Sequence, residues 1–423
     1  MISARRYTPT NSRFFTWLLR NTYGRLLRKA YRAEAEGLDL IQRLEPPYIV
    51  VGNHTMLQDA FLANAFVPKP IHWVASDGNM RNPMMRFLLI KLVGSIPKSK
   101  AIPDIETVNW IVEFIRKRKG VVGFYPEGQA TWNGSSLPAF GSTAKLIKLL
   151  KAPVVLALSK GGYMTKPRWA YNLRPGGMSI SFSLLFEPGE LKILSVEQID
   201  KKLNEAIAHD DYAWARSVSR SFEDPRRAEC LELALYACPD CGSLQSLKSR
   251  GARLTCLQCG AEHEYGTDGA FARIAQARPD AAAFGLVPKV GSNPILEMSA
   301  WDAWQEAYLE RLIESVFLPD PRIAIFQDDG VRFLKGKRMD TMKSLGTGRL
   351  ILTSKALRFE PGRGAALEFP VEGIEGPGVL KWNHFEFYIG KTVYRARFAN
   401  RAASGRKYAV ACGILGRRLR PAG

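Results

Sequence analysis

The sequence predicts an α/β domain with a mostly parallel sheet, followed by a small module built on four cysteines and a mainly β domain. Three observations support this fold class. Short β-branched runs alternate with amphipathic helical stretches in the first half of the chain. Two Cys-x2-Cys pairs follow at residues 238–259. Short strand patterns then recur as far as residue 398.

Composition sets the first limits on function. The chain has 423 residues, of which 24% are charged and 46% hydrophobic, which is ordinary for a globular protein with two or three domains. Its formal net charge of +20 predicts acidic partners: an anionic membrane surface, a phosphate-bearing substrate or nucleic acid. No apolar run approaches the ~20 residues needed to cross a bilayer, and no secretory signal pattern is present. We therefore expect a cytoplasmic protein.

Residues 1–33 are predicted to form a basic amphipathic N-terminal helix. They carry eight cations and no acid before Glu34. Between the cations, apolar and aromatic residues recur at helical spacing. Such a helix suits the plane of an anionic membrane, which here means the inner face of the membrane. The alternative is a helix that docks on the rest of the protein and shows its arginines to water. The residues that form the pattern are Arg5, Arg6, Arg13, Arg20, Arg25, Arg28, Lys29 and Arg32 with Phe15, Leu19, Tyr23, Leu26, Leu27 and Ala30.

Residues 34–225 are predicted to form the α/β domain. Strand and helix patterns alternate there, which favours a mostly parallel sheet whose ligands bind beyond the carboxyl ends of the strands. The expected strands are Tyr48–Val51, Ile71–Ala75, Val121–Tyr125, Val154–Leu158 and Met178–Phe182. The expected helices are Met56–Phe66, Pro83–Leu92, Ile105–Arg118, Ser142–Leu150, Ser195–Ala206 and Asp211–Ser221.

His54 and Asp59 are the first candidate catalytic residues. His54 follows the strand Tyr48–Val51 at a Gly52-Asn53 turn, and Asp59 lies on the first turns of the next helix. A histidine oriented by a carboxylate is the usual general base for an alcohol. The alternative is an ordinary histidine near a helix start, with the aspartate favoured by the helix dipole.

Further motifs resemble those of glycerolipid acyltransferases of the lysophosphatidate acyltransferase type. Pro126-Glu127-Gly128 follows a second buried strand, Gly94–Lys98 resembles the family's Gly-x-Ile block, and Ala152–Ala157 resembles its apolar strand with proline. Together with His54-x4-Asp59 they occur in the family's order. The resemblance extends roughly from Ile41 to Pro188, under half of the chain.

The resemblance implies an O-acyltransferase of phospholipid biosynthesis. It implies that His54 is the base, that Asp59 holds its ring, and that no catalytic cofactor is needed. The donor would be acyl-CoA or acyl-carrier protein, and the acceptor a lysophospholipid, first of all 1-acylglycerol-3-phosphate. Glu127 and Gly128 would help to position the acceptor, and Lys98 would offer a charge to phosphate. Without the resemblance, Glu127 would be a turn carboxylate and Lys98 a solvated surface group.

One departure leaves the acceptor head group open. The family's block commonly continues Pro-Glu-Gly-Thr-Arg-Ser, whereas this chain has Ala130 where the family has arginine. Lys98 also lacks the bidentate fork of an arginine. Catalysis is therefore better supported than the identity of the acceptor.

Residues 226–275 are predicted to form a zinc ribbon. Cys238, Cys241, Cys256 and Cys259 form two Cys-x2-Cys knuckles, each followed by glycine. This is the spacing of a four-cysteine zinc site, in which four protein ligands leave no open position, so the zinc should be structural. Paired redox dithiols or disulfides are the competing interpretation, which cytoplasmic conditions disfavour. We expect Cys230 and Cys412 to be small buried residues, and His263 to be surplus to the site.

The last part of the chain is predicted to contain a linker and helix (276–319) and a β domain (320–423). Ala277 to Pro294 is rich in Pro, Gly and Ala, and Ser299–Asp302 has the form of a capping box. Gly348–Thr353 and Ala356–Phe359, with a final helix at Lys407–Leu415, resemble a pleckstrin-homology or GRAM-type sheet. The expected strands are Ile323–Phe326, Val331–Leu334, Arg349–Leu352, Ala356–Phe359, Ala366–Phe369, Phe385–Ile389 and Val393–Phe398.

Basic residues of this β domain could also meet a membrane, although a solvated face is the simpler interpretation. They are Arg395, Arg397, Arg401, Arg406 and Lys407. A different class of function stays open as well, namely a non-catalytic membrane or nucleic-acid adaptor that uses the zinc ribbon and the basic surface. Nucleic acid is the less expected partner, because basic and aromatic residues interleave most densely in the amphipathic N-terminal helix.

Overall fold

The computed structural model describes residues 7–99, 104–278 and 297–419. The chain divides into two compact units. The N-terminal unit consists of Met1–Arg168 and Leu173–Glu223, and the C-terminal unit of Trp169–Asn172 and Asp224–Gly423. Most of the predicted linker Ala277–Pro294 lies outside the described residues.

The N-terminal unit begins with a long helical segment, which covers Arg13–Tyr31 of the residues 1–33 that were predicted to be helical. It comprises α1 (Arg13–Leu19), a π-helical turn η2 (Arg20–Gly24) and α2 (Arg25–Tyr31). The Ser12 side chain accepts a hydrogen bond from the Phe15 backbone N–H and so caps α1. Leu27 and Tyr31 are buried in the hydrophobic core of the unit. Among the described residues, no helix is long and apolar enough to cross a membrane.

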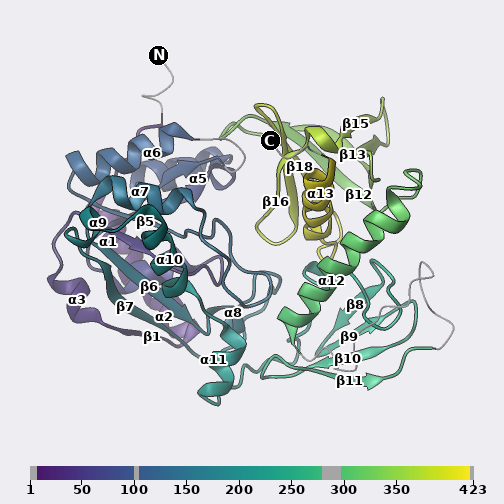
Figure 1. The fold of residues 1–423 in the computed structure, drawn as a ribbon, viewed down its shortest axis with the longest axis horizontal. Helices are drawn as coiled ribbons and strands as arrows, with labels where there is room; N and C mark the ends of the chain where they lie inside the picture. The colour runs from purple at the N-terminus through teal and green to yellow at the C-terminus, as the bar shows by residue number, and fades with distance from the viewer. Residues whose placement is uncertain (1–6, 100–103, 279–296, 420–423) are drawn as a thin grey trace. The chain divides into compact units, whose positions relative to one another are not determined.

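A mixed sheet forms the centre of this unit (Figure 1). It has seven strands, in the order β1-β7-β6-β2-β5-β3-β4. Strands β6, β2, β5, β3 and β4 run parallel to one another, whereas β7 is antiparallel to β6 and β1 is parallel to β7. The mostly parallel sheet is therefore confirmed, with two strands reversed at one side. The strands are β1 (Ala33–Glu36), β2 (Tyr48–Val51), β3 (Ile71–Ser76), β4 (Ile96–Lys98), β5 (Val121–Phe124), β6 (Val154–Lys160) and β7 (Met178–Phe186).

Helices cover both faces of the sheet. Because alternate residues of a strand point to opposite faces, Tyr48 and Val50 of β2 lie in one core and Ile49 and Val51 in another. The first core contains α2 and α4, and the second contains α6, α7 and α10. The helical segments after α2 are α3 (Leu38–Arg43), α4 (Asp59–Phe66), η3 (Asp77–Met80), α5 (Pro83–Arg86), η4 (Phe87–Val93), α6 (Ile105–Val112), η5 (Glu113–Lys117), α7 (Ser142–Leu150), α8 (Gly162–Thr165), α9 (Glu190–Ile193), α10 (Val196–Ile207) and α11 (Asp211–Ser217).

The C-terminal unit contains a small four-stranded antiparallel sheet in the order β11-β10-β9-β8. Its strands are β8 (Leu247–Arg250), β9 (Arg253–Cys256), β10 (Glu262–Tyr265) and β11 (Phe271–Ala275), and the short helix η6 (Leu231–Leu233) precedes them. All four cysteines of the predicted knuckles are buried in this part of the chain.

A larger antiparallel sheet of seven strands follows, in the order β15-β14-β13-β12-β18-β17-β16. Its aromatic core, which includes Phe333, Phe359 and Phe387, also contains residues of α12 and α13. The elements are α12 (Met298–Leu312), η7 (Ile313–Phe317), β12 (Phe326–Gly336), β13 (Lys343–Leu352), β14 (Ala356–Pro361), β15 (Leu367–Pro370), η8 (Val371–Gly373), β16 (Glu375–Leu380), β17 (His384–Ile389), β18 (Thr392–Phe398) and α13 (Gly405–Leu419).

Three details of the sequence prediction for this unit were wrong. The predicted capping box at Ser299–Asp302 does not form, because α12 begins at Met298 and the Asp302 side chain pairs with Arg406 at 2.9 Å. The predicted strands Ile323–Phe326 and Val331–Leu334 are not separate, because a single strand, β12, runs from Phe326 to Gly336. Strand β16 (Glu375–Leu380) was missed, since two glycines and a proline hide its pattern.

Three of the five basic residues that were suggested to form a surface of the β domain instead form ion pairs within it. Arg406 is 6% exposed and Lys407 3% exposed. Arg406 pairs with Asp302 and Glu306 of α12, and the Lys407 ammonium lies 2.6 Å from Asp328. Arg395 pairs with the buried Glu386. Burying these cations requires partner carboxylates. The partners of Arg406 and Lys407 come from distant parts of the sequence, whereas Glu386 lies on the strand that pairs with that of Arg395.

Candidate active site

His54 lies in the loop between β2 and α4, at the carboxyl edge of the parallel strands. Hydrogen bonds fix both the backbone N–H and the backbone carbonyl of His54. The His54 N–H donates to Glu127 Oε1 at 2.7 Å, and its carbonyl accepts from the Thr131 N–H at 2.9 Å. The loop that follows β5 therefore fixes the loop that follows β2.

Asp59 fixes the imidazole of His54. The His54 Nδ1 lies 2.8 Å from Asp59 Oδ2, which also accepts the backbone N–H groups of Thr55 and Met56. The other oxygen of Asp59 accepts the Thr55 hydroxyl at 3.0 Å. Asp59 is 2% exposed, so it is a buried carboxylate surrounded by donors. Since it only accepts hydrogen bonds, Nδ1 carries the proton and Nε2 has the basic lone pair.

The Nε2 atom of His54 is available to accept a proton from a substrate. The His54 side chain is 20% exposed, and no described residue forms a hydrogen bond with its Nε2. One face of the ring stacks on Tyr125, with 4.4 Å between the centroids. Tyr125 in turn stacks on Trp73 of β3 at 5.0 Å. The ring is therefore held by stacking on one face and by a carboxylate at Nδ1, which leaves a single nitrogen for a substrate proton.

Sequence reasoning missed these aromatic partners. Tyr125 stands directly before Pro126-Glu127-Gly128, but its position in the sequence does not show that it stacks on His54. Burial raises the pKa of Tyr125 well above its usual value, with a smaller contribution from Asp59, so its phenol stays neutral. It therefore supports the ring of His54 without adding charge.

Glu127 lies at the end of β5 with both carboxylate oxygens bonded to backbone amides. Oε1 accepts from His54 and Oε2 accepts from Leu137 at 2.8 Å. The side chain is 3% exposed. Burial raises its pKa to about 8, although the two backbone N–H donors act in the opposite direction. This geometry favours a role in positioning His54, and direct contact with an acceptor stays a prediction.

Gly128 is required by its backbone conformation. Its φ of +72° lies in the left-handed region, and a Cβ there would come within 2.4 Å of the Phe140 ring. The space above Gly128 is thus already taken by Phe140, which is itself 63% exposed. Its contact with substrate stays a prediction.

Lys98 ends β4 at the same edge of the sheet as His54. Three strand spacings separate β4 from β2, which corresponds to roughly 14 Å between the backbones. The Lys98 Nζ donates to the Ser99 carbonyl at 3.1 Å. At Ala130 the side chain is buried and the carbonyl accepts from Arg168, which packs over Trp132.

The four predicted cysteines gather in one cluster in the C-terminal unit, and their sulfurs lie within 4.8 Å of one another. Two of the Sγ–Sγ distances, Cys238 to Cys259 and Cys241 to Cys256, are 3.8 Å. Four thiolates around a tetrahedral zinc lie about 3.8 Å apart, whereas a disulfide needs about 2.05 Å. The cysteines are therefore close enough to hold a metal ion.

The two Cys-x2-Cys knuckles have the same backbone geometry at the glycine that follows each of them. Gly242 and Gly260 have φ values of +74° and +77°, and each donates its N–H to the carbonyl of the first cysteine of its knuckle at 2.9 Å. His263 is not part of the cluster. Its Nε2 lies 2.9 Å from Asp240, which also pairs with Arg273.

Residues 32–157 match the family model described as Acyltransferase. The crystal structure of the 1-acyl-sn-glycerophosphate (LPA) acyltransferase PlsC from Thermotoga maritima is 18% identical, with a TM-score of 0.41 over 48% of this chain and 80% of that chain. A chain of the 8S snRNP assembly intermediate is 13% identical, with a TM-score of 0.19 over 24% of this chain and 86% of that chain. Comparison with curated proteins gives no match. On the family match, the segment that contains His54, Asp59 and Glu127 is an acyltransferase domain.

Proposed function

We propose that this protein is a peripheral-membrane O-acyltransferase that transfers a fatty acyl group from an acyl thioester to the hydroxyl of a lysophospholipid. The observation that carries the proposal is the open Nε2 of His54, whose Nδ1 is bonded to the buried Asp59. Acyl-CoA or acyl-carrier protein is the donor class. The first acceptor to test is 1-acylglycerol-3-phosphate.

In this mechanism His54 Nε2 takes the proton of the acceptor hydroxyl while its oxygen attacks the thioester carbonyl. The imidazolium that forms is stabilised by Asp59. The tetrahedral intermediate then collapses, the carbon–sulfur bond breaks, and the thiolate recovers the proton from His54. No acyl-enzyme forms and no cofactor takes part. Glu127 keeps the backbone of His54 in place, and Lys98 provides a charge toward the acceptor phosphate.

The N-terminal helical segment supports a membrane location. Phe14, Trp17 and Leu26 are 70%, 53% and 65% exposed, and cations lie between them in the sequence. Exposed apolar side chains beside cations suit an anionic bilayer surface. The helix also packs against the domain through Leu27 and Tyr31, so one side serves the core and the other is available to lipid.

The cysteine cluster is proposed to hold one structural zinc ion. Its four thiols would complete the coordination sphere, so the ion would stabilise the fold and take no part in acyl transfer. Metal analysis should find one zinc per chain, and a metal-free preparation that melts at the same temperature would contradict this. The strand order of the large sheet, with α13 packed on it, supports the pleckstrin-homology-like interpretation, which remains a proposal.

The experiment that tests the proposed function is incubation of the purified protein with acyl-CoA and a panel of lysolipids, read by mass spectrometry. We expect a diacyl product from at least one lysophospholipid. If a folded, zinc-loaded protein acylates no member of the panel with either acyl-CoA or acyl-carrier protein as donor, the proposal is wrong.

A further inference from the structure

A cavity of about 660 Å³ lies at the edge of the sheet opposite to His54. Its lining includes Pro46, Pro70 and Gly120, which stand just before β2, β3 and β5. These strands are parallel, so their amino ends share one edge, whereas His54 follows the carboxyl end of β2. The four residues of β2 place the two edges roughly 13 Å apart. The cavity is therefore distinct from the candidate active site.

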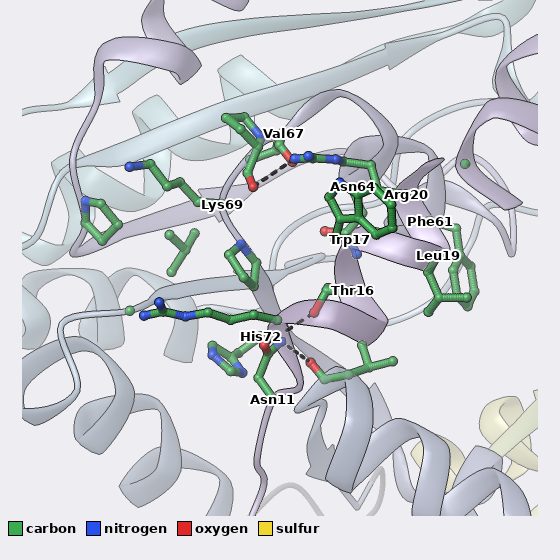
Figure 2. A pocket seen from close by; sticks show the side chains of 18 of the residues that line it. Asn11, Thr16, Trp17, Leu19, Arg20, Phe61, Asn64, Val67, Lys69 and His72 are labelled. Carbon is green, nitrogen blue, oxygen red and sulfur yellow. Dashed lines mark hydrogen bonds between the residues drawn. The ribbon is translucent and has the colours of Figure 1, made fainter. Parts of the chain in front are cut away.

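The N-terminal helical segment forms the other wall of the cavity. Trp17, Arg20 and Tyr23 line it from α1 and η2, and Phe61 lines it from α4. Arg20 Nη1 donates to the Pro68 carbonyl at 2.9 Å and so ties the helical segment to the end of α4. Figure 2 shows the Arg20 side chain extending across to the segment that carries Val67 and Lys69.

The lining carries far more positive than negative charge. It contains five cations, Arg13, Arg20, Lys69, Arg118 and Lys119, but only one carboxylate, that of Glu45. Glu45 pairs with Lys69, and Arg118 pairs with Glu113. Arg13 and Lys119 form no ion pair with any described residue. A concave site lined by one sign of charge concentrates the opposite sign, so the cavity attracts anions.

His72 is also part of the lining, but it adds no charge. Burial lowers the pKa of its imidazole, and its Nδ1 lies 2.9 Å from the Gly94 carbonyl. The surplus of positive charge therefore comes from the arginines and lysines alone.

Aromatic side chains stand beside these cations. Trp17, Tyr23 and Phe61 are 53%, 40% and 38% exposed, and the Tyr23 and Phe61 rings meet edge to face at 5.6 Å. Tryptophan and tyrosine, two of these three residue types, are enriched at membrane–water interfaces. A small inorganic anion would leave this apolar surface unused, whereas a lipid would cover it.

We propose that this cavity binds the head group of an anionic phospholipid of the bilayer, with the lipid's acyl chains against Trp17, Tyr23 and Phe61. The bound lipid is an anchor and not a substrate, because the cavity opens at the other edge of the sheet from His54. The proposal thus adds a second lipid site to the proposed acyl transfer and does not depend on it.

The test uses the full-length protein and short-chain lipids below their micelle concentration, followed by titration calorimetry. The probes are dihexanoyl phosphatidylglycerol, dihexanoyl phosphatidylcholine and inorganic phosphate. We expect saturable binding of the phosphatidylglycerol, with affinity at least about tenfold weaker for the other two.

A matched pair of charge-reversal variants locates the site. Arg13→Glu with Lys119→Glu changes the two cations of the lining that have no ion pair among the described residues. Arg25→Glu with Lys29→Glu makes the same change of charge on the same helical segment but outside the lining. All four residues are exposed, and a glutamate at position 13 lies favourably at a helix start. Unchanged melting temperatures would show that both variants fold.

We expect the cavity variant to bind phosphatidylglycerol at least about tenfold more weakly, and the control variant to bind it within about twofold of the unmodified protein. Equal weakening in both variants would overturn the proposal, since it would indicate a diffuse field and not a site. Phosphate that binds as tightly as the lipid would also overturn it. Acyl transfer to detergent-dispersed substrate should be unchanged in the cavity variant, so the outcome is separate from that of the proposed catalytic function.

Discussion

Two histidine–aspartate pairs lie in the N-terminal unit, and they are built differently. His54 approaches Asp59 through Nδ1 at 2.8 Å, whereas His209 approaches Asp211 through Nε2 at 2.7 Å. His54 is 20% exposed with an open nitrogen, and His209 is 10% exposed. Asp211 is fully buried and accepts the backbone N–H groups of Gly161, Tyr163 and Met164. The second pair therefore fixes the start of α8. The two pairs differ in the ring nitrogen that meets the aspartate, in the exposure of the histidine and in the backbone groups that the aspartate holds, and these differences favour His54 as the base.

The largest expected effect is a loss of acyl transfer that occurs on substitution of His54 but not of His209. His54→Ala should lower acyl transfer by about 10²–10⁴-fold, because it removes the general base but little core volume. His209→Ala should keep most of the activity and reduce stability instead. Initial rates and thermal melting of both variants check this. Comparable activity in the folded His54 variant would remove the catalytic assignment.

The two aspartates should respond differently to conversion to asparagine. At position 59 an amide oxygen can still accept the three donors on Oδ2, and its NH2 group can face the Thr55 hydroxyl, so the fold should survive. The negative charge that stabilises the imidazolium is lost, so the rate should fall severely. Asp211→Asn should mainly destabilise, because both oxygens accept backbone N–H groups and an NH2 group would oppose one of them. The same loss of stability in both variants would speak against this distinction.

The contribution of Glu127 to stability should depend on pH. Its pKa in the folded protein is raised to about 8 by burial, so the folded state holds this proton over a range in which the unfolded chain has released it. The free energy of unfolding contributed by Glu127 should therefore fall as pH rises from about 4.5 to about 8. Glu127→Gln removes this titration. Urea denaturation at several pH values should show the unmodified protein losing stability relative to the Glu127→Gln variant as pH rises toward 8, and a pH-independent difference would refute it.

The smallest expected effect concerns membrane binding. Deleting residues 1–33 would also remove Leu27 and Tyr31 from the core, so a cleaner change is the replacement of the exposed Phe14, Trp17 and Leu26 by serine. This should weaken binding to anionic vesicles in a manner that high salt does not abolish, because it removes apolar contact. Activity on detergent-dispersed substrate should be kept. Vesicle sedimentation checks this, and undiminished binding would place the membrane contact elsewhere.

The sequence predicted local features well. Periodicity predicted the strand Tyr48–Val51 and the helix Ser142–Leu150 with their observed bounds, and the strand Val121–Tyr125 to within one residue, because their patterns match the buried faces that they form. The spacing of the two Cys-x2-Cys pairs was also enough to predict that the four cysteines form one cluster. Strand β1 was missed, since the alternation of Ala33–Glu36 is weak and depends on pairing with β7, far along the chain.

Long-range partners could not be predicted. The bond between Glu127 and the His54 amide joins residues 73 positions apart, and no local pattern reveals it. Arg406 looked like a surface cation because the sequence does not show that Asp302, 104 positions away, lies against it. In each case the side chain takes its role from a partner that only the folded chain supplies.

The most direct test of the central claim is the tautomer of each histidine, measured by nitrogen-15 NMR of the imidazoles. The chain has only five histidines, so single substitutions can assign their signals. We predict that neutral His54 carries its proton on Nδ1 and leaves Nε2 bare, whereas His209 carries it on Nε2. A His54 protonated on Nε2, or the same tautomer in both residues, would contradict the assignment of His54 as the base.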